Sequence, residues 1–283
     1  MTMTDAIASE EPALPAGVTI HPLSPGIGIE VRGVDLSEPF GDDVADCLRT
    51  LYERYHVLMF RQPDLPEEGQ TRLANLVGRT SQRERNRTKI ASKDNQYVSN
   101  VRPDGIFGKG ELTLHMDQLF LEEPLKALIL YAVEIPETGG DTIFADSMAA
   151  YDSMPDALKA RINGLNCRHT RVYDAALSKD WNVVDGADHA PSTLHPMART
   201  DPRSGRKALW ANELTTVGVD GLDAEDSAAL LKEARGYLDN PAITYHHRWT
   251  PGDLILWDNS VVKHARTPFD PEARRTLRRT AIL

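Results

Sequence analysis

His115 and Asp117 stand two positions apart in the otherwise apolar run TLHMDQLF, residues 113–120. Side chains at i and i+2 of a β-strand project from the same face, so an imidazole nitrogen and a carboxylate oxygen can point at one atom. The chain has nine histidines, and His115 is the only one followed two positions later by Asp or Glu. The pattern therefore indicates the first two ligands of a metal ion, with an ordinary ion pair on a half-exposed strand as its alternative.

A third ligand must come from elsewhere in the chain. His264 lies in the run LILWDNSVVKHAR, shortly after an apolar segment that ends in Trp257, Asp258 and Asn259. Two histidines and one carboxylate on one face of an octahedron leave the opposite face open, which is the arrangement of non-haem Fe(II) oxygenases. We therefore expect His115, Asp117 and His264 to bind a metal.

Composition narrows the class of protein that carries these residues. The chain has 283 residues, 41% of them hydrophobic, so it can bury a sizeable core. Cys47 and Cys167 are far apart and belong to no Cys/His cluster, which argues against a disulfide framework or a structural zinc site. The net charge of -10 disfavours binding to nucleic acid or to an anionic membrane surface.

The N-terminal segment MTMTDAIASEEPALPAG differs in composition from the rest of the chain. Residues 1–17 are small, acidic and interrupted by proline, which predicts a mobile leader, and no basic region precedes an apolar one as in a signal peptide. No linker or repeat interrupts the remainder of the chain. We expect one domain over residues 18–283, in the cytoplasm.

Apolar periodicity predicts a mainly β protein with a few helices. Helical spacing occurs over residues 42–55, 66–77 and 223–238, and further helices are expected around 146–163. Short β-rich runs cover 56–61, 112–120, 126–134, 207–212, 242–249, 253–258 and 274–283. Many short strands separated by turns favour an antiparallel sandwich or barrel with helices on one face.

Two long segments resemble a known family. LHMDQLFLEEPLKALILYAVEIPETGGDTIFAD (114–146) and WDNSVVKHARTPFDPEARRTLRRTAI (257–282) are similar to the taurine dioxygenase (TauD/TfdA) family of Fe(II)/2-oxoglutarate-dependent dioxygenases. The resemblance extends over nearly the whole chain. It implies a double-stranded β-helix (jelly roll) with flanking helices, and the use of Fe(II), 2-oxoglutarate and O2.

The resemblance also implies roles for individual residues. His115, Asp117 and His264 match the metal ligands, while Thr142 and Arg275 match the residues that bind the distal carboxylate of 2-oxoglutarate. The physical chemistry agrees, because a planar guanidinium can hold a carboxylate with two parallel hydrogen bonds.

Substrate contacts are expected close to these residues. Arg279 is four residues after Arg275, on the same face of the strand, and we expect it to meet an anionic group. Gln118 and Asn100 are expected to line the substrate pocket. Glu111 would suit an amine or hydroxyl if it reaches that pocket. The neighbouring Arg274 and Arg278 should point to the opposite face and be solvated.

The sequence thus predicts a dioxygenase that oxidises, most simply by hydroxylation, a C–H bond of a small anionic or zwitterionic substrate and releases succinate and CO2. It predicts no nucleic-acid or membrane partner and allows a homo-oligomer. Two alternatives stay open. One is a metal-dependent hydrolase that uses zinc at the same ligands, which leaves Thr142 and Arg275 without a role. The other is a non-catalytic jelly-roll binding protein.

Overall fold

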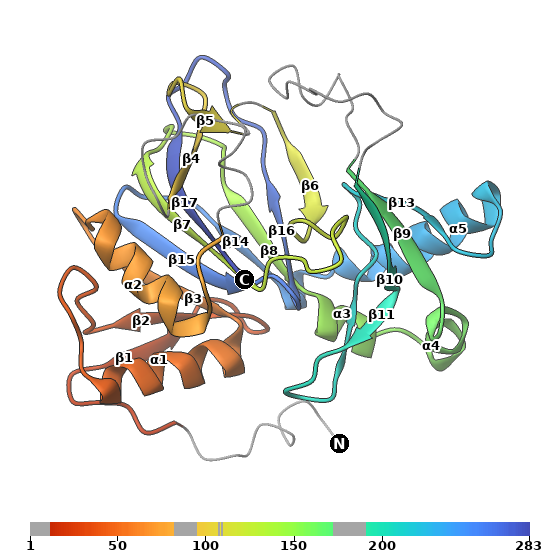
Figure 1. The fold of residues 1–283 in the computed structure, drawn as a ribbon, viewed down its shortest axis with the longest axis horizontal. Coiled ribbons are helices and arrows are strands. Elements are labelled where there is room, and N and C mark those ends of the chain that lie inside the picture. The colour runs from red at the N-terminus through yellow and green to blue at the C-terminus, as the bar shows by residue number, and fades with distance from the viewer. Residues whose placement is uncertain (1–11, 82–94, 107, 109, 172–190) are drawn as a thin grey trace.

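Two β-sheets face each other in the computed structural model, which describes residues 12–81, 95–106, 108, 110–171 and 191–283. Most of the expected leader therefore lies outside the described residues. The larger sheet is largely antiparallel and has the strand order β1-β2-β3-β15-β7-β17-β4-β5 (Figure 1). Its strands are β1 (Thr19–Pro22), β2 (Ile29–Arg32), β3 (Val57–Arg61), β15 (Asp253–Asp258), β7 (Ala127–Glu134), β17 (Thr276–Ile282), β4 (Gln96–Ser99) and β5 (Gly105–Ile106).

The smaller sheet has four antiparallel strands in the order β14-β8-β16-β6. They are β14 (Thr244–His247), β8 (Thr142–Asp146), β16 (Val262–Arg266) and β6 (Leu112–His115). A buried apolar cluster fills the space between the two sheets, and it includes Met59 and Leu128 from the larger sheet and Phe144 and Val262 from the smaller one. The predicted mainly β jelly roll with flanking helices is confirmed.

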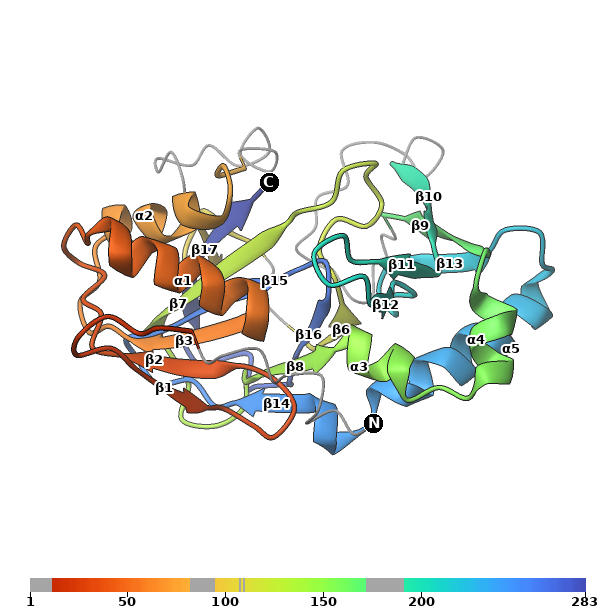
Figure 2. The ribbon, with the colours of Figure 1, turned by 90° about the horizontal axis from the view of Figure 1, so that it is seen from below.

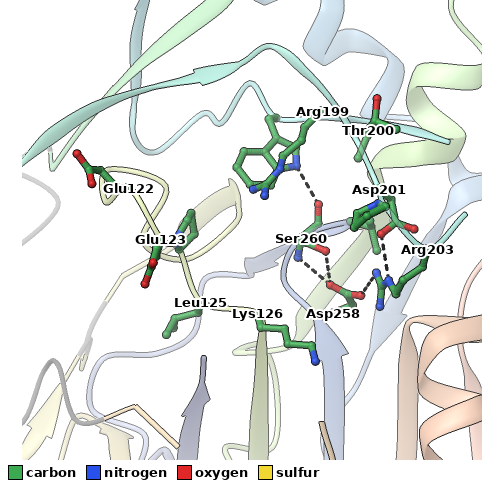
Figure 3. A pocket seen from close by; sticks show the side chains of 15 residues that line it. Glu122, Glu123, Leu125, Lys126, Arg199, Thr200, Asp201, Arg203, Asp258 and Ser260 are labelled. Carbon is green, nitrogen blue, oxygen red and sulfur yellow. Dashed lines mark hydrogen bonds and ion pairs between the residues drawn. The ribbon is translucent and has the colours of Figure 1, made fainter. Parts of the chain in front are cut away.

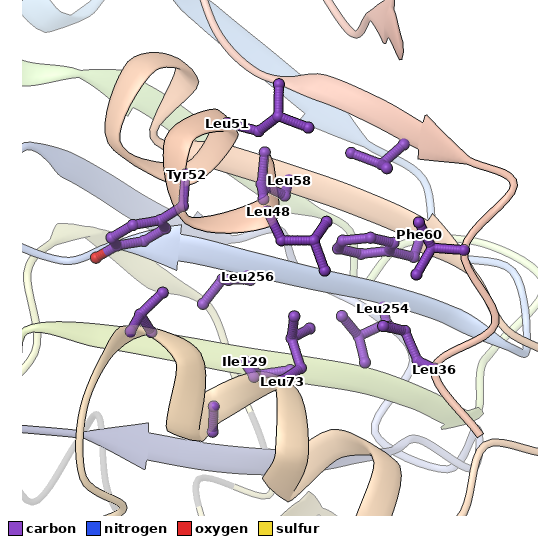
Figure 4. Packing of buried hydrophobic residues seen from close by; sticks show 14 of the residues in the cluster. Leu36, Leu48, Leu51, Tyr52, Leu58, Phe60, Leu73, Ile129, Leu254 and Leu256 are labelled. Atoms are coloured by element: carbon purple, nitrogen blue, oxygen red, sulfur yellow. The ribbon is translucent and has the colours of Figure 1, made fainter. Parts of the chain in front are cut away.

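Two helices cover the outer face of the larger sheet. These are α1 (Asp42–Tyr55) and α2 (Glu67–Val77), whose bounds agree with the predicted helices to within one residue (Figure 2). Leu48 and Leu51 of α1 and Leu73 of α2 pack against Phe60 and Leu256 of the sheet (Figure 4). The apolar stripe predicted for residues 42–55 is the face of α1 that is buried in this core.

A third layer covers the back of the four-stranded sheet. It contains a three-stranded sheet of order β10-β9-β13, a two-stranded β11-β12 ribbon, and several helices. Its elements are α3 (Ser147–Asp152), α4 (Asp156–Ile162), β9 (Asn166–Thr170), β10 (Ser192–Pro196), β11 (Ala198–Thr200), β12 (Lys207–Leu209), β13 (Thr216–Val219), α5 (Ala224–Arg235), and the 3-10 turns η3 (Gly236–Leu238) and η4 (Pro241–Ile243). Ala145 on β8 belongs to the apolar cluster that joins this layer to the four-stranded sheet.

Several predicted elements differ from the observed ones. The run 112–120 is a strand only as far as His115, the run 207–212 only as far as Leu209, and the helix expected over 223–238 becomes α5 followed by the separate turn η3. The predicted β-rich runs did not include β8, β9, β10, β13 and β16. The strands β9, β10 and β13 are short and half-exposed, whereas β8 and β16 are largely buried on both faces, so none of the five shows a clear alternation of apolar and polar residues. Among the described residues, no helix has both the length and the apolarity needed to span a bilayer.

Candidate metal centre

The two predicted histidine ligands lie on neighbouring strands. His115 ends β6 and His264 is central in β16, and the antiparallel register places them directly opposite each other. Their ring centroids are 4.2 Å apart. With Asp117, they offer three ligand atoms that all lie within 4.8 Å of one another, and the described residues contain no other such group of His, Cys, Asp or Glu.

The proton position on His115 leaves a nitrogen available for a metal. Its Nδ1 is 2.7 Å from the backbone oxygen of Thr113. A carbonyl oxygen can only accept, so the proton of the imidazole is on Nδ1 and the lone pair is on Nε2. That Nε2 atom is 3.2 Å from Asp117 Oδ1 and points to the centre of the cluster. A backbone carbonyl that fixes the tautomer in this way is the usual support of a metal-binding histidine.

His264 is held in its neutral form by its surroundings. Burial, together with the nearby His115, lowers the pKa of His264 to about 3. Its Nε2 lies 3.7 Å from Asp117 Oδ1, and the ring packs against Trp257 with centroids 4.8 Å apart. A neutral imidazole can coordinate a metal, whereas an imidazolium cannot.

Asp117 reaches the cluster although it is not on a strand. The backbone leaves β6 after His115, and two fully buried asparagines then hold it by their side chains. Asn212 accepts from the Met116 amide at 2.9 Å and donates to the Met116 oxygen at 3.0 Å. Asn259 accepts from the Asp117 amide at 2.7 Å and donates to the Asp117 oxygen at 3.1 Å. These side chains provide the hydrogen bonds that a neighbouring strand would otherwise supply.

Arg279 contacts Asp117, the carboxylate of the candidate metal site. Its Nη2 donates to Asp117 Oδ2 at 2.6 Å and its Nη1 donates to Gln96 Oε1 at 2.7 Å. Burial would raise the pKa of Asp117, but the Arg279 guanidinium holds it well below its ordinary value. The carboxylate is therefore ionised and keeps Oδ1 directed at the histidines. The anion that Arg279 meets in this structure is thus a protein carboxylate.

A second buried arginine, Arg275, lies near the start of β8. Arg275 is 2% exposed, and its Nε and Nη2 donate to the Gly140 oxygen at 3.1 and 2.8 Å. A Cβ on Gly140 would lie 2.8 Å from Arg275 Nε, and φ is +68° there, so glycine is required for the arginine to pack at this place. Burial, with the neighbouring Arg266, lowers the pKa of Arg275 to about 9. No carboxylate forms an ion pair with it in the described part of the chain, so it is suited to an external anion.

Thr142 and Arg266 lie beside each other on paired strands. Thr142 is buried and its hydroxyl oxygen accepts from Trp249 Nε1 at 2.9 Å, which directs the hydroxyl proton elsewhere. Arg266 is its partner in the β16–β8 register, and the guanidinium carbons of Arg266 and Arg275 each lie 5.6 Å from the Phe269 ring centroid. The sequence interpretation missed Arg266, although its position two residues after His264, on the same face of β16, marks it.

The remaining predicted substrate residues occupy different environments. Asn100 supports the backbone before β17: its amide donates to Pro271 and Ala273 oxygens at 3.1 and 2.7 Å and accepts from the Arg275 amide at 2.9 Å. Glu111 is exposed at the start of β6. Gln118 is 6% exposed and adopts φ 61°, in the left-handed region. Gln118 thus lies next to Asp117, whereas Asn100 holds the backbone of Arg275 in place.

The expected alternation of arginines on β17 holds at only one of two positions. Arg274 is exposed and pairs with Glu134 at 2.5 Å, as expected. Arg278 was expected to be solvated, but it is 6% exposed and donates to Gln70 Oε1 and to the Leu65 oxygen, both at 2.7 Å. The expectation was wrong because α2 covers that face of the larger sheet, which the strand pattern by itself does not show.

A cavity of about 370 Å³ opens on the far side of the turn that carries Asn259 (Figure 3). Asp258 lies at its floor and pairs with Arg203 at 2.5 Å and with the Ser260 hydroxyl at 2.6 Å. Arg199 covers the Trp210 ring, with its guanidinium carbon 4.2 Å from the centroid. None of the three metal-site residues lines this cavity, and the charged group at its floor is already compensated.

The fold is a jelly roll, and two histidines and one carboxylate form a candidate metal site in it. The family model described as "Taurine catabolism dioxygenase TauD, TfdA family" matches residues 19–281. The chain therefore belongs to the TauD/TfdA family, and it is a 2-oxoglutarate-dependent dioxygenase, an enzyme that needs 2-oxoglutarate and O2.

Individual relatives match nearly the full length of the chain. The chain is 32% identical to the "Alpha-ketoglutarate-dependent 2,4-dichlorophenoxyacetate dioxygenase" of Cupriavidus pinatubonensis, over 94% of this chain and 98% of that one. It is 30% identical to the "(S)-phenoxypropionate/alpha-ketoglutarate-dioxygenase" of Sphingobium herbicidovorans, over 91% and 92%. The solved structure of AAD-2 with Mn(II) and N-oxalylglycine superposes with a TM-score of 0.78 at 26% identity, over 94% and 96%.

Proposed function

We propose that this enzyme binds Fe(II) through His115, Asp117 and His264 and oxidises a C–H bond of a small organic anion or zwitterion, most simply by hydroxylation, with release of succinate and CO2. The observation that carries the proposal is the convergence of these three ligand atoms within 4.8 Å of one another. The donor set fits the metal, since neutral imidazoles and one carboxylate suit iron. Iron and 2-oxoglutarate, when bound, would supply the oxidising chemistry.

The protein's own residues would bind the co-substrate. Arg275 has no carboxylate partner in the described residues, and Thr142 accepts from Trp249, which leaves its hydroxyl proton to donate. We propose that both hold the distal carboxylate of 2-oxoglutarate and so direct its keto acid end toward the metal. Arg266 lies next to Thr142 in the sheet register and would add positive charge on that side.

Substrate would bind on the side of the metal near Gln118. Gln118 directly follows Asp117, and Arg279 reaches the Asp117 carboxylate from β17. We propose these two as the residues nearest the substrate, and Asn100 and Glu111 stay predictions as substrate contacts. Two relatives are named for phenoxyalkanoic acids, which makes small aromatic carboxylates the first compounds to test. The cytoplasmic location and a homo-oligomer also stay predictions.

The test is a screen for substrate-dependent succinate release. Purified protein loaded with Fe(II) is given 2-oxoglutarate, O2 and a panel of aryloxyalkanoates, sulfate esters and amino acids. Succinate formed in a fixed ratio to oxidised product supports the proposal. Hydrolysis by the zinc-loaded protein without 2-oxoglutarate would support the hydrolase alternative instead. If no compound causes oxygen uptake, and iron with 2-oxoglutarate yields no visible absorption band under anaerobic conditions, the proposal fails.

A further inference from the structure

Three basic side chains, two of them fully buried, lie behind the candidate metal centre, on the side of β16 that faces the third layer. Lys263 immediately precedes His264, so it projects from the other face of the strand, where it is 0% exposed. His169 lies on β9 and is also 0% exposed, and Arg235 is at the C-terminal end of α5. Lys263 thus belongs to the four-stranded sheet and the other two to the third layer, and the proposed metal chemistry uses none of them.

Each of the three side chains has a buried nitrogen without a hydrogen-bond partner among the described residues. The atoms are Lys263 Nζ, His169 Nε2 and Arg235 Nε. Buried polar groups are almost always hydrogen-bonded, and three unsatisfied ones in one place require an explanation. Glu213 attracts Lys263 and Arg235, but it is exposed and forms no ion pair with either in the described part of the chain.

A chain of hydrogen bonds connects Arg235 to His169 and fixes the imidazole proton. Arg235 Nη2 donates to the Asn212 oxygen, and the Asn212 amide donates to Thr216 Oγ1 at 2.7 Å. Thr216 Oγ1 lies 3.2 Å from His169 Nδ1. With the Thr216 hydroxyl donating to Nδ1, the imidazole carries its proton on Nε2. In this tautomer all three unpartnered nitrogens are donors.

The three groups are close enough to act on one another. Burial, with contributions from His195, Lys263 and Arg235, lowers the pKa of His169 to about 3. Cys167 is nearby, but burial raises the pKa of its thiol to about 11, so it is neutral and supplies no negative charge. The cluster thus contains N–H donors and the charge of the Arg235 guanidinium, and Glu213, the carboxylate that attracts this guanidinium, is exposed.

We propose that Lys263 Nζ, Arg235 Nε and His169 Nε2 bind a small inorganic anion of halide size. A monoatomic anion can accept several N–H donors at once, and it compensates charge that a water molecule would leave unpaired. Lys263 pairs in register with Ala145, which belongs to a core of small and aliphatic side chains such as Ala211 and Leu209, and this packing favours a single-atom ligand. The site would stabilise the fold and is independent of the proposed reaction.

Crystals of the metal-loaded protein grown in sodium bromide test the proposal directly. Data collected at the bromine absorption edge should show an anomalous peak between the three nitrogens. A water molecule, or nothing, at that position would overturn the proposal. Crystals of Lys263→Met grown in the same way should lose the peak, and Arg235→Gln serves the same purpose if the lysine variant does not fold.

Thermal unfolding supplies a solution test. At constant ionic strength, replacing isethionate by bromide should raise the wild-type Tm by about 2–4 °C, since a ligand that binds the folded state stabilises it. Lys263→Met should lose this response. Lys232→Met removes an exposed lysine of α5 and should keep it. A wild-type Tm that does not depend on bromide, or a response unchanged in Lys263→Met, would overturn the proposal.

Discussion

Buried charge is compensated on one face of β16 and uncompensated on the other. On the inner face, His264 lies beside the ionised Asp117, whose carboxylate pairs with Arg279 at 2.6 Å. On the outer face, Lys263 has no hydrogen-bond partner among the described residues. Adjacent residues of one strand thus lie in opposite electrostatic environments. A buried ionisable group therefore indicates a ligand site in two situations. Either its neighbours surround a space that a ligand can fill, or it has no partner in the protein at all.

The largest effect is expected from Asp117→Asn. The change removes one candidate metal ligand and the carboxylate that pairs with Arg279 at 2.6 Å. We expect succinate production to fall by at least about 100-fold, with loss of bound iron measured by metal analysis. Asp220→Asn is the control, because Asp220 is an exposed carboxylate that pairs with Arg168. Full activity with stoichiometric iron in Asp117→Asn would contradict the assignment.

The next effect concerns the co-substrate. Arg275→Lys keeps the charge but loses the planar pair of donors, so the KM for 2-oxoglutarate should rise about 10- to 100-fold, as expected for a lost hydrogen bond to a charged group. Steady-state kinetics with varied 2-oxoglutarate measure this. Arg274→Lys, next in the chain but exposed, should leave the KM unchanged. Equal values in both variants would show that Arg275 does not bind the co-substrate.

Arg279→Gln tests whether the arginine positions the metal ligand. Without its 2.6 Å bond to Asp117, the affinity for Fe(II) or Mn(II) should fall about 10- to 100-fold, the usual cost of removing a group that holds a ligand. Anaerobic metal titration measures it. Arg278→Gln is the matched control, because Arg278 is buried next to it but bonds Gln70. Arg278→Gln should lower the free energy of unfolding and leave the metal affinity unchanged. A similar loss of metal affinity in both variants would contradict the proposed role of Arg279.

The smallest effect is expected on the outer face. In buffer without halide, Lys263→Met should leave the free energy of unfolding unchanged or raise it by about 1 kcal/mol, because an apolar side chain replaces a buried amine that has no hydrogen-bond partner among the described residues. Urea unfolding of the metal-loaded protein, with Lys232→Met as control, measures this. A loss of several kcal/mol would show that the protein itself compensates Lys263, and the contrast between the two faces of β16 would disappear.

Local spacing was sufficient to predict much of the site. The pair His115 and Asp117 and the candidate His264 were found from residue types and spacing, whereas Arg275 was chosen from the resemblance to the TauD/TfdA family. The apolar stripe of α1 likewise predicted the helix that covers the larger sheet. These features depend on residues that are close together in the chain, so they can be recognised from the sequence alone.

Other features depend on segments that are distant in the chain. Asp117 lies beyond the end of β6, and it is Asn259, 142 residues away, that holds its backbone. Arg279 pairs with Asp117, 162 residues away. Only the tertiary structure decides such pairings, because a side chain's burial and its partner depend on which elements pack against its strand. The same packing decides that Lys263, one residue before a metal ligand, is buried without a counter-charge among the described residues.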